Sequence, residues 1–177
     1  MQILFVLAVL SYMLSSASYF AYLFIQRNPL QQIGCALLLS GAACQSAVII
    51  WSFAQSGHMP VNNLHETLSL VSWTLVGAFL VLHIKLRVKV LGVYVAPLAA
   101  FILFAASQFP KEPMQPQNLL KGFWLVVHII TIFLGDAGFA LACGVGVLYL
   151  IQERSIKSKS RGFFFNFSGT ADENRHL

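Results

Sequence analysis

Long apolar runs, separated by short polar stretches, dominate the pattern of this chain. Each run is close to the roughly 20 residues that an α-helix needs to cross a bilayer. The pattern therefore predicts an all-α integral membrane protein with five transmembrane helices, and it places the transmembrane domain in residues 1–153. The predicted spans are Ile3–Ile25, Ile33–Ala54, Leu64–Ile84, Val88–Gln108 and Gly122–Ile151.

The lysines and arginines lie in the connections between these runs and set the expected orientation. Cytoplasmic loops of membrane proteins carry an excess of basic residues. If the N-terminus is outside, only Lys111 and Lys121 face outward, so we predict an outer N-terminus and a cytoplasmic C-terminus. Residues 154–177 then form a cytoplasmic tail, which we expect to be disordered. The basic residues on the cytoplasmic side are Arg27, Lys85, Arg87, Lys89, Arg154, Lys157, Lys159 and Arg161.

Composition narrows the function classes. The chain is 58% hydrophobic and 10% charged, whereas about a quarter of the residues of a soluble domain are charged, so a lipid bilayer is the expected surrounding. The formal net charge is +5, but the basic residues flank apolar runs, and we predict no nucleic-acid partner. No catalytic signature is present. A CxxCH motif is also absent, so the chain is not itself a c-type cytochrome.

Two ionisable residues, His128 and Asp136, lie in the fifth predicted span. A charge in the middle of a bilayer costs about 2.5–3.5 kcal/mol, so such residues usually face protein or water. We therefore expect His128 to face the bundle interior, where it either hydrogen-bonds to a neighbouring helix or ligates a metal or haem iron. Its helical stripe also holds Trp124, Gly135, Ala142 and Gly146, and Gly138, Ala142 and Gly146 form a ridge of small residues suited to close helix packing.

Asp136 leaves two readings open. It lies about 80° around the helix from His128 and is too far along the axis to touch it. Its carboxyl group is either protonated and bonded to a helix neighbour or part of a proton relay, for which no partner is visible.

The third predicted span begins with the polar segment NNLHETLSLVSW. Asn63 can cap this helix with Glu66 three residues later, as in a capping box, and this structural role is favoured over catalysis by Glu66. His65, Ser69 and Ser72 share one face, which predicts a polar stripe that reaches inward. Trp73 beside it either lines an aromatic pocket or packs. The outer half of the bundle is thus expected to gather His58, His65, His128, Trp73 and Trp124.

Two segments resemble the cytochrome c assembly protein family, which includes CcsA/ResC, CcmC and HemX-like membrane proteins, and the likeness is closest to the HemX-like branch. GHMPVNNLHETLSLVSW resembles the family's Gly-x-x-Pro-x-x-Asn-x-Tyr-Glu-Ser-Leu-x-x-x-Ser-Trp stretch, with His65 in place of the tyrosine. WLVVHIITIFLGDAGFALACGVGVLYLIQER resembles the segment with Trp-x-x-x-His and a Leu-Tyr-Leu exit. The residues that match the first pattern are Gly57, Pro60, Asn63, Glu66 and Trp73.

The resemblance implies a haem-handling protein of the bacterial cytoplasmic membrane that presents haem at the outer face. His128 matches the family histidine that serves as an axial ligand of haem iron, and Trp124, Trp73 and His65 are the candidates to contact the macrocycle. The implied cofactor is haem b, held transiently. The implied partners are other cytochrome c assembly membrane proteins and apocytochrome c. Such a chain is a haem carrier or assembly factor rather than an independent enzyme.

The chain also departs from the family pattern. The family's tryptophan-rich loop and a second outer histidine do not follow Lys159, so we hypothesise a truncated or frame-shifted member. Asp136 stands where a tyrosine or asparagine is more usual, and no family role carries over to it. An alternative reading is a non-catalytic membrane subunit or chaperone of a respiratory or tetrapyrrole-related complex.

Overall fold

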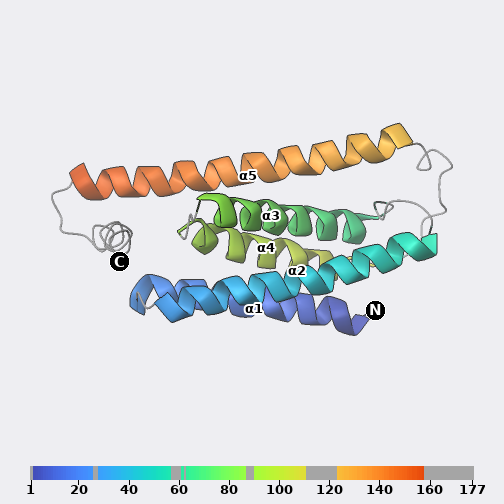
Figure 1. Cartoon of the computed structure of the whole chain (residues 1–177), viewed down its shortest axis with the longest axis horizontal. Coiled ribbons are helices and arrows are strands. Elements are labelled where there is room, and N and C mark those ends of the chain that lie inside the picture. Colours follow the sequence, from blue (N-terminus) through green and yellow to red (C-terminus); the bar gives the residue numbers. More distant parts are fainter. Residues whose placement is uncertain are drawn as a thin grey trace.

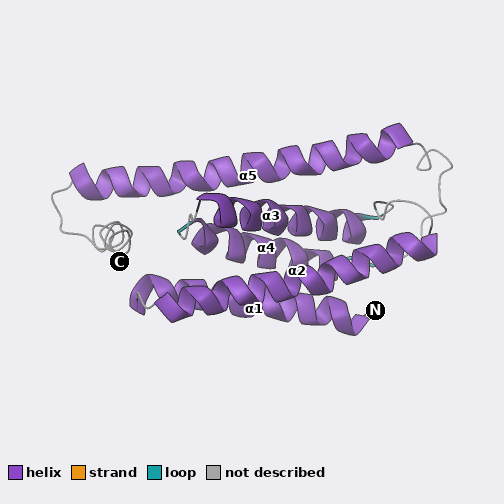
Figure 2. Cartoon of the chain, viewed as in Figure 1, coloured by secondary structure: helices purple, strands orange, loops and turns teal. Residues whose placement is uncertain are grey.

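The computed structural model describes residues 2–25, 28–56, 61, 63–86, 90–110 and 123–157. Within these residues the chain forms five α-helices and no strand (Figure 2). Four of the helices are long and apolar enough to cross a membrane, and α4 is a shorter apolar helix. The predicted all-α membrane fold is therefore confirmed. The helices are α1 (Gln2–Ile25), α2 (Asn28–Ser56), α3 (Leu64–Leu86), α4 (Leu91–Ser107) and α5 (Phe123–Lys157).

Two helices are longer than the hydrophobic pattern predicts. α2 begins at Asn28 instead of Ile33, because Pro29 fits the first turn of a helix, where its missing N–H is not needed. α5 continues to Lys157, past the predicted end of the span at Ile151 and past residue 153, where the transmembrane domain was predicted to end. α4 has 17 residues, about 26 Å of helix, which is at the lower end of what a bilayer requires.

The helices run along one another (Figure 1). α1 and α2 form one layer, α5 forms the opposite layer, and α3 and α4 lie between them. α1 packs along α2 and α4, α3 packs along α4, and α5 packs mainly on α3. α5 thus lies on the opposite side of the bundle from α1 and α2. The start of α1, the end of α2 and the start of α5 lie at the same end of the bundle (Figure 1), which is the end that the charge pattern assigns to the outside.

Two tyrosines of α1 fill the centre of the bundle. The side chains of Tyr12 and Tyr19 are fully buried, and glycines make room for both rings. A Cβ atom at Gly41 of α2 would lie 2.5 Å from the ring of Tyr12, and one at Gly92 of α4 would lie 2.5 Å from the ring of Tyr19. Any larger residue at these two positions would force the tyrosines out of place.

Buried hydrogen bonds tie the helices together where lipid offers no partner. The hydroxyl of Tyr12 donates to Oε1 of Gln45 at 2.8 Å, and Nε2 of Gln45 donates to the carbonyl oxygen of Ser69 at 2.7 Å. This chain of bonds links α1, α2 and α3. Ser15 likewise donates to the carbonyl of Gly34, and Ser72 to that of Ala99. Polar groups inside a membrane protein need such internal partners.

Candidate functional site

The start of α3 is fixed by the cap that the sequence predicts. Oδ1 of Asn63 accepts a hydrogen bond of 2.8 Å from the backbone N–H of Glu66. The carbonyl of Asn63 accepts two more, from the backbone N–H and the hydroxyl of Thr67. The capping role of Asn63 is confirmed. Gly57, Pro60 and His58, which precede it in the sequence, lie outside the described residues.

His65 is buried in the first turn of α3, where it joins three helices. Its Nδ1 lies 2.7 Å from the carbonyl oxygen of Ala106 in α4, and its ring centroid is 4.8 Å from that of Phe5 in α1. A carbonyl can only accept, so Nδ1 carries the proton. Ser69 and Ser72 are buried on the same face, which confirms the predicted inward polar stripe.

Trp73 packs between helices and uses its polar atom there. Its Nε1–H donates to the hydroxyl of Ser46 in α2 at 2.8 Å, and its ring is half-buried. Of the two roles that the sequence left open for Trp73, interhelical packing is therefore the one that its contacts show.

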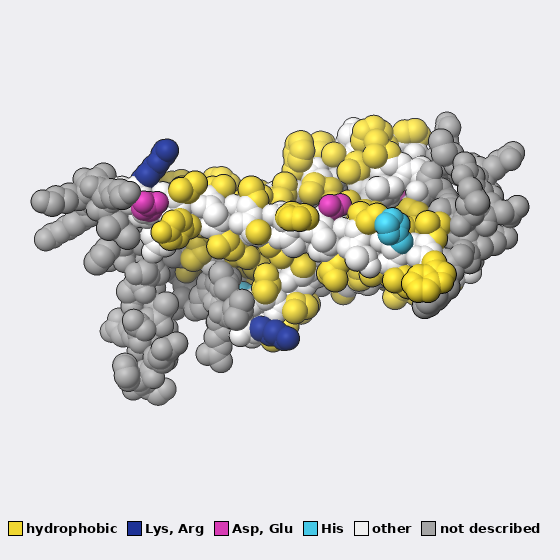
Figure 3. Space-filling view, turned by 90° about the horizontal axis from the view of Figure 1, so that it is seen from above, with side chains coloured by type: hydrophobic (Ala, Val, Ile, Leu, Met, Phe, Trp, Pro, Cys, Tyr) yellow, Lys and Arg dark blue, Asp and Glu magenta, His cyan; other side chains and the backbone are white. Residues whose placement is uncertain are grey.

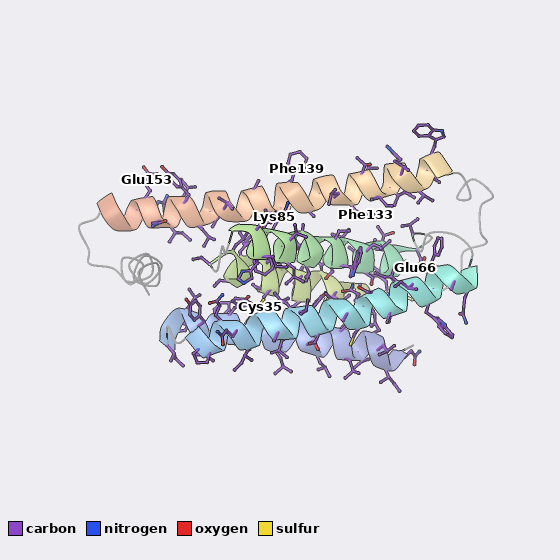
Figure 4. The ribbon with its side chains drawn as sticks, viewed as in Figure 1. Cys35, Glu66, Lys85, Phe133, Phe139 and Glu153 are labelled. Carbon is purple, nitrogen blue, oxygen red and sulfur yellow. The ribbon has the colours of Figure 1, made fainter. Side chains whose placement is uncertain are left out.

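A cavity of about 220 Å³ lies beside His65, between α1, α2 and α3. Its wall combines apolar side chains, among them Phe5, Val48 and Trp51, with polar ones. The polar side chains come from both sides of the α2–α3 connection and are Ser52, Gln55, Asn63, His65, Glu66 and Ser69. Figure 4 shows Glu66 near one end of α3 and Lys85 near the other, so this mixed cavity belongs to the predicted outer end.

The structure overturns the predicted orientation of His128. This side chain is exposed, whereas Ala137 and Leu141 are the buried hydrophobic residues of α5. His128 and Ala137 are about two and a half helical turns apart, which places them on opposite faces of α5. α5 lies against α3 and α4 with its Ala137 face, so His128 points away from the bundle.

The ridge of small residues that was expected to pack against a neighbour also faces outward. Cβ atoms built at Gly138 and Gly146 would meet nothing within 4 Å, and Ala142 is exposed. The close approach occurs instead at Gly144, where a Cβ atom would clash with the ring of Tyr94 in α4. α5 is consequently the least buried of the four long helices. Only 11% of its apolar 18-residue segment is buried, compared with 28–33% of the corresponding segments of α1, α2 and α3.

Of the five aromatic and histidine residues that were expected to converge, His58 lies outside the described residues, and the other four do not form one group. Trp124, in the first turn of α5, is 82% exposed, and it lies one turn from His128 on the outward side. Asp136 is exposed too. Seen over α5, histidine and acidic side chains lie at a surface that is otherwise largely hydrophobic (Figure 3), and Phe139 points away from the other helices (Figure 4). His65 and Trp73 instead lie inside the bundle.

No three histidines, cysteines or acidic residues come together as a metal site in the part of the chain that the structure describes. Haem binding does not require such a cluster, because a single histidine nitrogen can hold the haem iron. His128 has no hydrogen bond to any described residue, and Gly135, about two turns further on, leaves its side of the helix open. This face can therefore offer an axial nitrogen and a flat, apolar surface, but it does not enclose a macrocycle.

Two features of the bundle interior, one polar and one aromatic, were not predicted from the sequence. Gln45, which connects Tyr12 to Ser69, was overlooked, although an amide in the middle of an apolar span is itself a signal of an inward-facing residue. The aromatic wall of the cavity, Phe5 and Trp51, gave no such signal, because aromatic residues are common on both the inside and the lipid side of a membrane helix.

The fold and the polar interior define an α-helical, multi-pass membrane protein. Comparison with known proteins makes this more specific, because the family model described as cytochrome C assembly protein matches residues 61–174, more than half of the chain. The chain belongs to the cytochrome c assembly protein family.

Several relatives cover most of the chain at low identity. Protein HemX of Brevibacillus brevis is 28% identical over 139 residues, which are 77% of this chain and 51% of the relative. Cytochrome c biogenesis protein CcsA of Chlorella vulgaris is 28% identical over 119 residues, which are 65% of this chain and 38% of the relative. CcsA of Synechococcus elongatus is 28% identical over 137 residues, which are 75% of this chain and 42% of the relative.

The chain thus spans about half or less of the length of the relatives that it matches. The region that the family model matches includes α3, α4 and α5, which hold His65, Trp73 and His128. No solved structure matches the chain with statistical significance.

Proposed function

We propose that this protein handles haem during cytochrome c biogenesis, with His128 as an axial ligand of the haem iron at the outward face of α5. The observation that carries the proposal is the position of His128, an imidazole without a hydrogen-bonding partner among the described residues on an apolar helix. An ionisable side chain exposed to lipid costs free energy, so a position of this kind usually has a functional partner. A neutral imidazole is a common ligand of haem iron.

The surroundings of His128 suit one side of a macrocycle. Trp124 lies one turn before His128, and its exposed ring can pack on the porphyrin edge. Thr131 and Gly135 follow on the same side of α5, and both are small. The hydroxyl of Thr131 already donates to the carbonyl of Val127 at 2.8 Å, so it adds no unpaired polar group. A flat ring could therefore approach the helix closely here.

A haem group bound at His128 contacts this chain on one side only, so its other side needs a second wall. Longer members of the family have segments that could form this wall. The matched relatives are about twice as long as the aligned region or longer, so further helices in such proteins can supply the other wall and the second axial ligand. Other cytochrome c assembly membrane proteins and apocytochrome c are the proposed partners. We propose that the haem is haem b, that it is held transiently, and that the protein acts in the bacterial cytoplasmic membrane.

Haem titration of the purified chain tests this proposal. The detergent-solubilised protein should develop a Soret band that saturates, and His128→Ala should abolish it. His83→Ala is the matched control, because His83 lies near the other end of the bundle and packs on the ring of Phe79. Equal haem binding by the His128→Ala variant and the unmodified protein would overturn the assignment of the ligand.

The outward face of α5 also supports a second candidate function, a non-catalytic membrane subunit or chaperone. Gly135, Gly138, Ala142 and Gly146 are exposed on this face, and small residues at such spacing allow another membrane helix to pack closely. In this case Gly138→Leu should prevent co-purification of a stoichiometric partner, whereas Ala47→Leu, at an exposed position of α2, should not. The His128→Ala variant would then behave as the unmodified protein does.

A further inference from the structure

Asp136 is an ionisable residue of α5 that has no part in the proposed haem site. The membrane-length part of α5 runs from Trp124 to Arg154, and Asp136 lies three residues before its midpoint, a distance of about 5 Å along the axis. Trp124 is about 18 Å away along the helix axis and Arg154 about 27 Å. The short side chain of an aspartate does not reach lipid headgroups from this depth, so a partner of its carboxylate has to lie within the membrane.

The carboxylate of Asp136 is exposed and forms no hydrogen bond or ion pair with any described residue of this chain. Asp136 lies about 100° around α5 from Ala137 and about 140° from Leu141. Those two residues are buried against the bundle. His128 is about 12 Å away along the helix axis, which is too far for a contact. Asp136 therefore faces lipid or a molecule that lies beside α5.

No lysine or arginine of the chain lies at the depth of Asp136. Both residue types are absent from residues 1–26, 28–84, 90–110 and 122–153. Lys85 and Arg154 are at the end of the bundle that the charge pattern assigns to the cytoplasm. No metal-binding cluster of histidine, cysteine or acidic residues occurs among the described residues either. A cation that balances this carboxylate therefore has to come from outside the five helices.

The surface around Asp136 suits contact with another helix. Ile132 and Phe139, about one turn to either side, are 46% and 79% exposed, and Phe139 points away from the other helices (Figure 4). Cys143, two turns from Asp136, is exposed as well. These residues form an apolar strip with one acidic group. The strip is distinct from the ridge of small residues, because Ala142 in the middle of that ridge lies about 120° around the helix from Asp136.

We propose that Asp136 docks a transmembrane helix of a partner protein that carries one lysine or arginine near the middle of the bilayer. The carboxylate and the cation form an ion pair, and apolar side chains of the partner helix pack on Ile132 and Phe139. Charged residues inside a membrane usually pair with one another, and the low dielectric of the surroundings strengthens their attraction. Asp136 thus selects a helix with a single basic residue over a wholly apolar one.

Association of the full chain with synthetic transmembrane peptides tests the proposal, measured by energy transfer between labelled chain and labelled peptide in phosphatidylcholine liposomes. The peptides are leucine–alanine helices of about 23 residues with lysine, asparagine or leucine at the central position. We expect the lysine peptide to associate at least about tenfold more tightly than the other two. Equal association of the lysine and leucine peptides would overturn the proposal. An asparagine peptide that binds as tightly as the lysine peptide would also overturn it, because a neutral hydrogen bond would then suffice.

Variants of the chain show whether Asp136 is the docking residue. Asp136→Asn keeps the size of the side chain and removes its charge, so it should lower the affinity for the lysine peptide to that for the leucine peptide. Glu153→Gln is the matched control, because Glu153 lies about 26 Å further along α5, and it should leave the affinity unchanged. Asp136→Lys should reverse the preference, so that a peptide with a central aspartate binds and the lysine peptide does not.

Unchanged affinity in Asp136→Asn, or an equal loss in Glu153→Gln, would refute the proposal. Haem is absent from these assays and the ridge of small residues is unchanged in every variant. Their result is therefore separate from those of the haem titration and of the Gly138→Leu variant.

Discussion

The imidazole of His65 and the carbonyl oxygen of Ala106 form a hydrogen bond of 2.7 Å between α3 and α4. Loss of this bond leaves a buried carbonyl without its partner, which costs about 1–3 kcal/mol. We therefore expect His65→Phe to lower the free energy of unfolding by about this amount, measured by denaturant titration in detergent. His128→Phe is the control, and because His128 is exposed it should change stability by less than about 0.5 kcal/mol. Equal losses in the two variants would contradict the different burial of the two histidines.

The two buried tyrosines of α1 give a second matched pair. The hydroxyl of Tyr12 donates to Gln45 at 2.8 Å, whereas the buried hydroxyl of Tyr19 has no hydrogen-bond partner among the described residues. Tyr12→Phe should lower the free energy of unfolding by about 1–3 kcal/mol, because it leaves an acceptor of Gln45 unpaired. Tyr19→Phe removes an unpaired polar atom and should leave stability unchanged or increase it. Thermal unfolding of both variants in the same detergent would show whether Tyr12→Phe is the less stable one, as we expect.

Glycines on the two faces of α5 should differ in their response to alanine. A Cβ atom at Gly144 would overlap the ring of Tyr94, whereas one at Gly138 would meet nothing within 4 Å. Gly144→Ala should therefore destabilise the packing of α5 by about 1–3 kcal/mol. Gly138→Ala should be neutral or slightly stabilising, because alanine favours a helix. Limited proteolysis and unfolding measurements on the two variants test this rotation of α5, and a loss at Gly138 alone would show that the helix packs by its other face.

The sequence was sufficient to predict the helices and the inward face of α3. Apolar runs of membrane length can hardly form anything but helices in lipid, and Ser69 and Ser72 had no plausible place except the interior. The start of α2 was less predictable, because Asn28 and Pro29 suit a turn and a helix start equally well. The hydrophobic pattern does not decide between these two structures.

The rotation of α5 could not be derived from its own sequence. Small residues occur on opposite sides of this helix, at Gly138 and Ala142 on one side and at Ala137 and Gly144 on the other. A Cβ atom at Gly144 would clash with the ring of Tyr94 in α4, and the sequence of α5 alone does not show which of its two sides meets that ring. For the same reason the predicted convergence of His65 and His128 was wrong, although each residue lies on the helix that was expected.

Imidazole rescue of a His128→Gly variant tests the central claim, that His128 is a ligand of haem iron, most directly. Removal of the side chain should eliminate the Soret band of the haem-titrated protein, and millimolar free imidazole should restore it, because the free ring can occupy the vacated position at the iron. His83→Gly should keep the band without added imidazole. A His128→Gly protein that binds haem as the unmodified chain does, or a lost band that imidazole does not restore, would contradict the account.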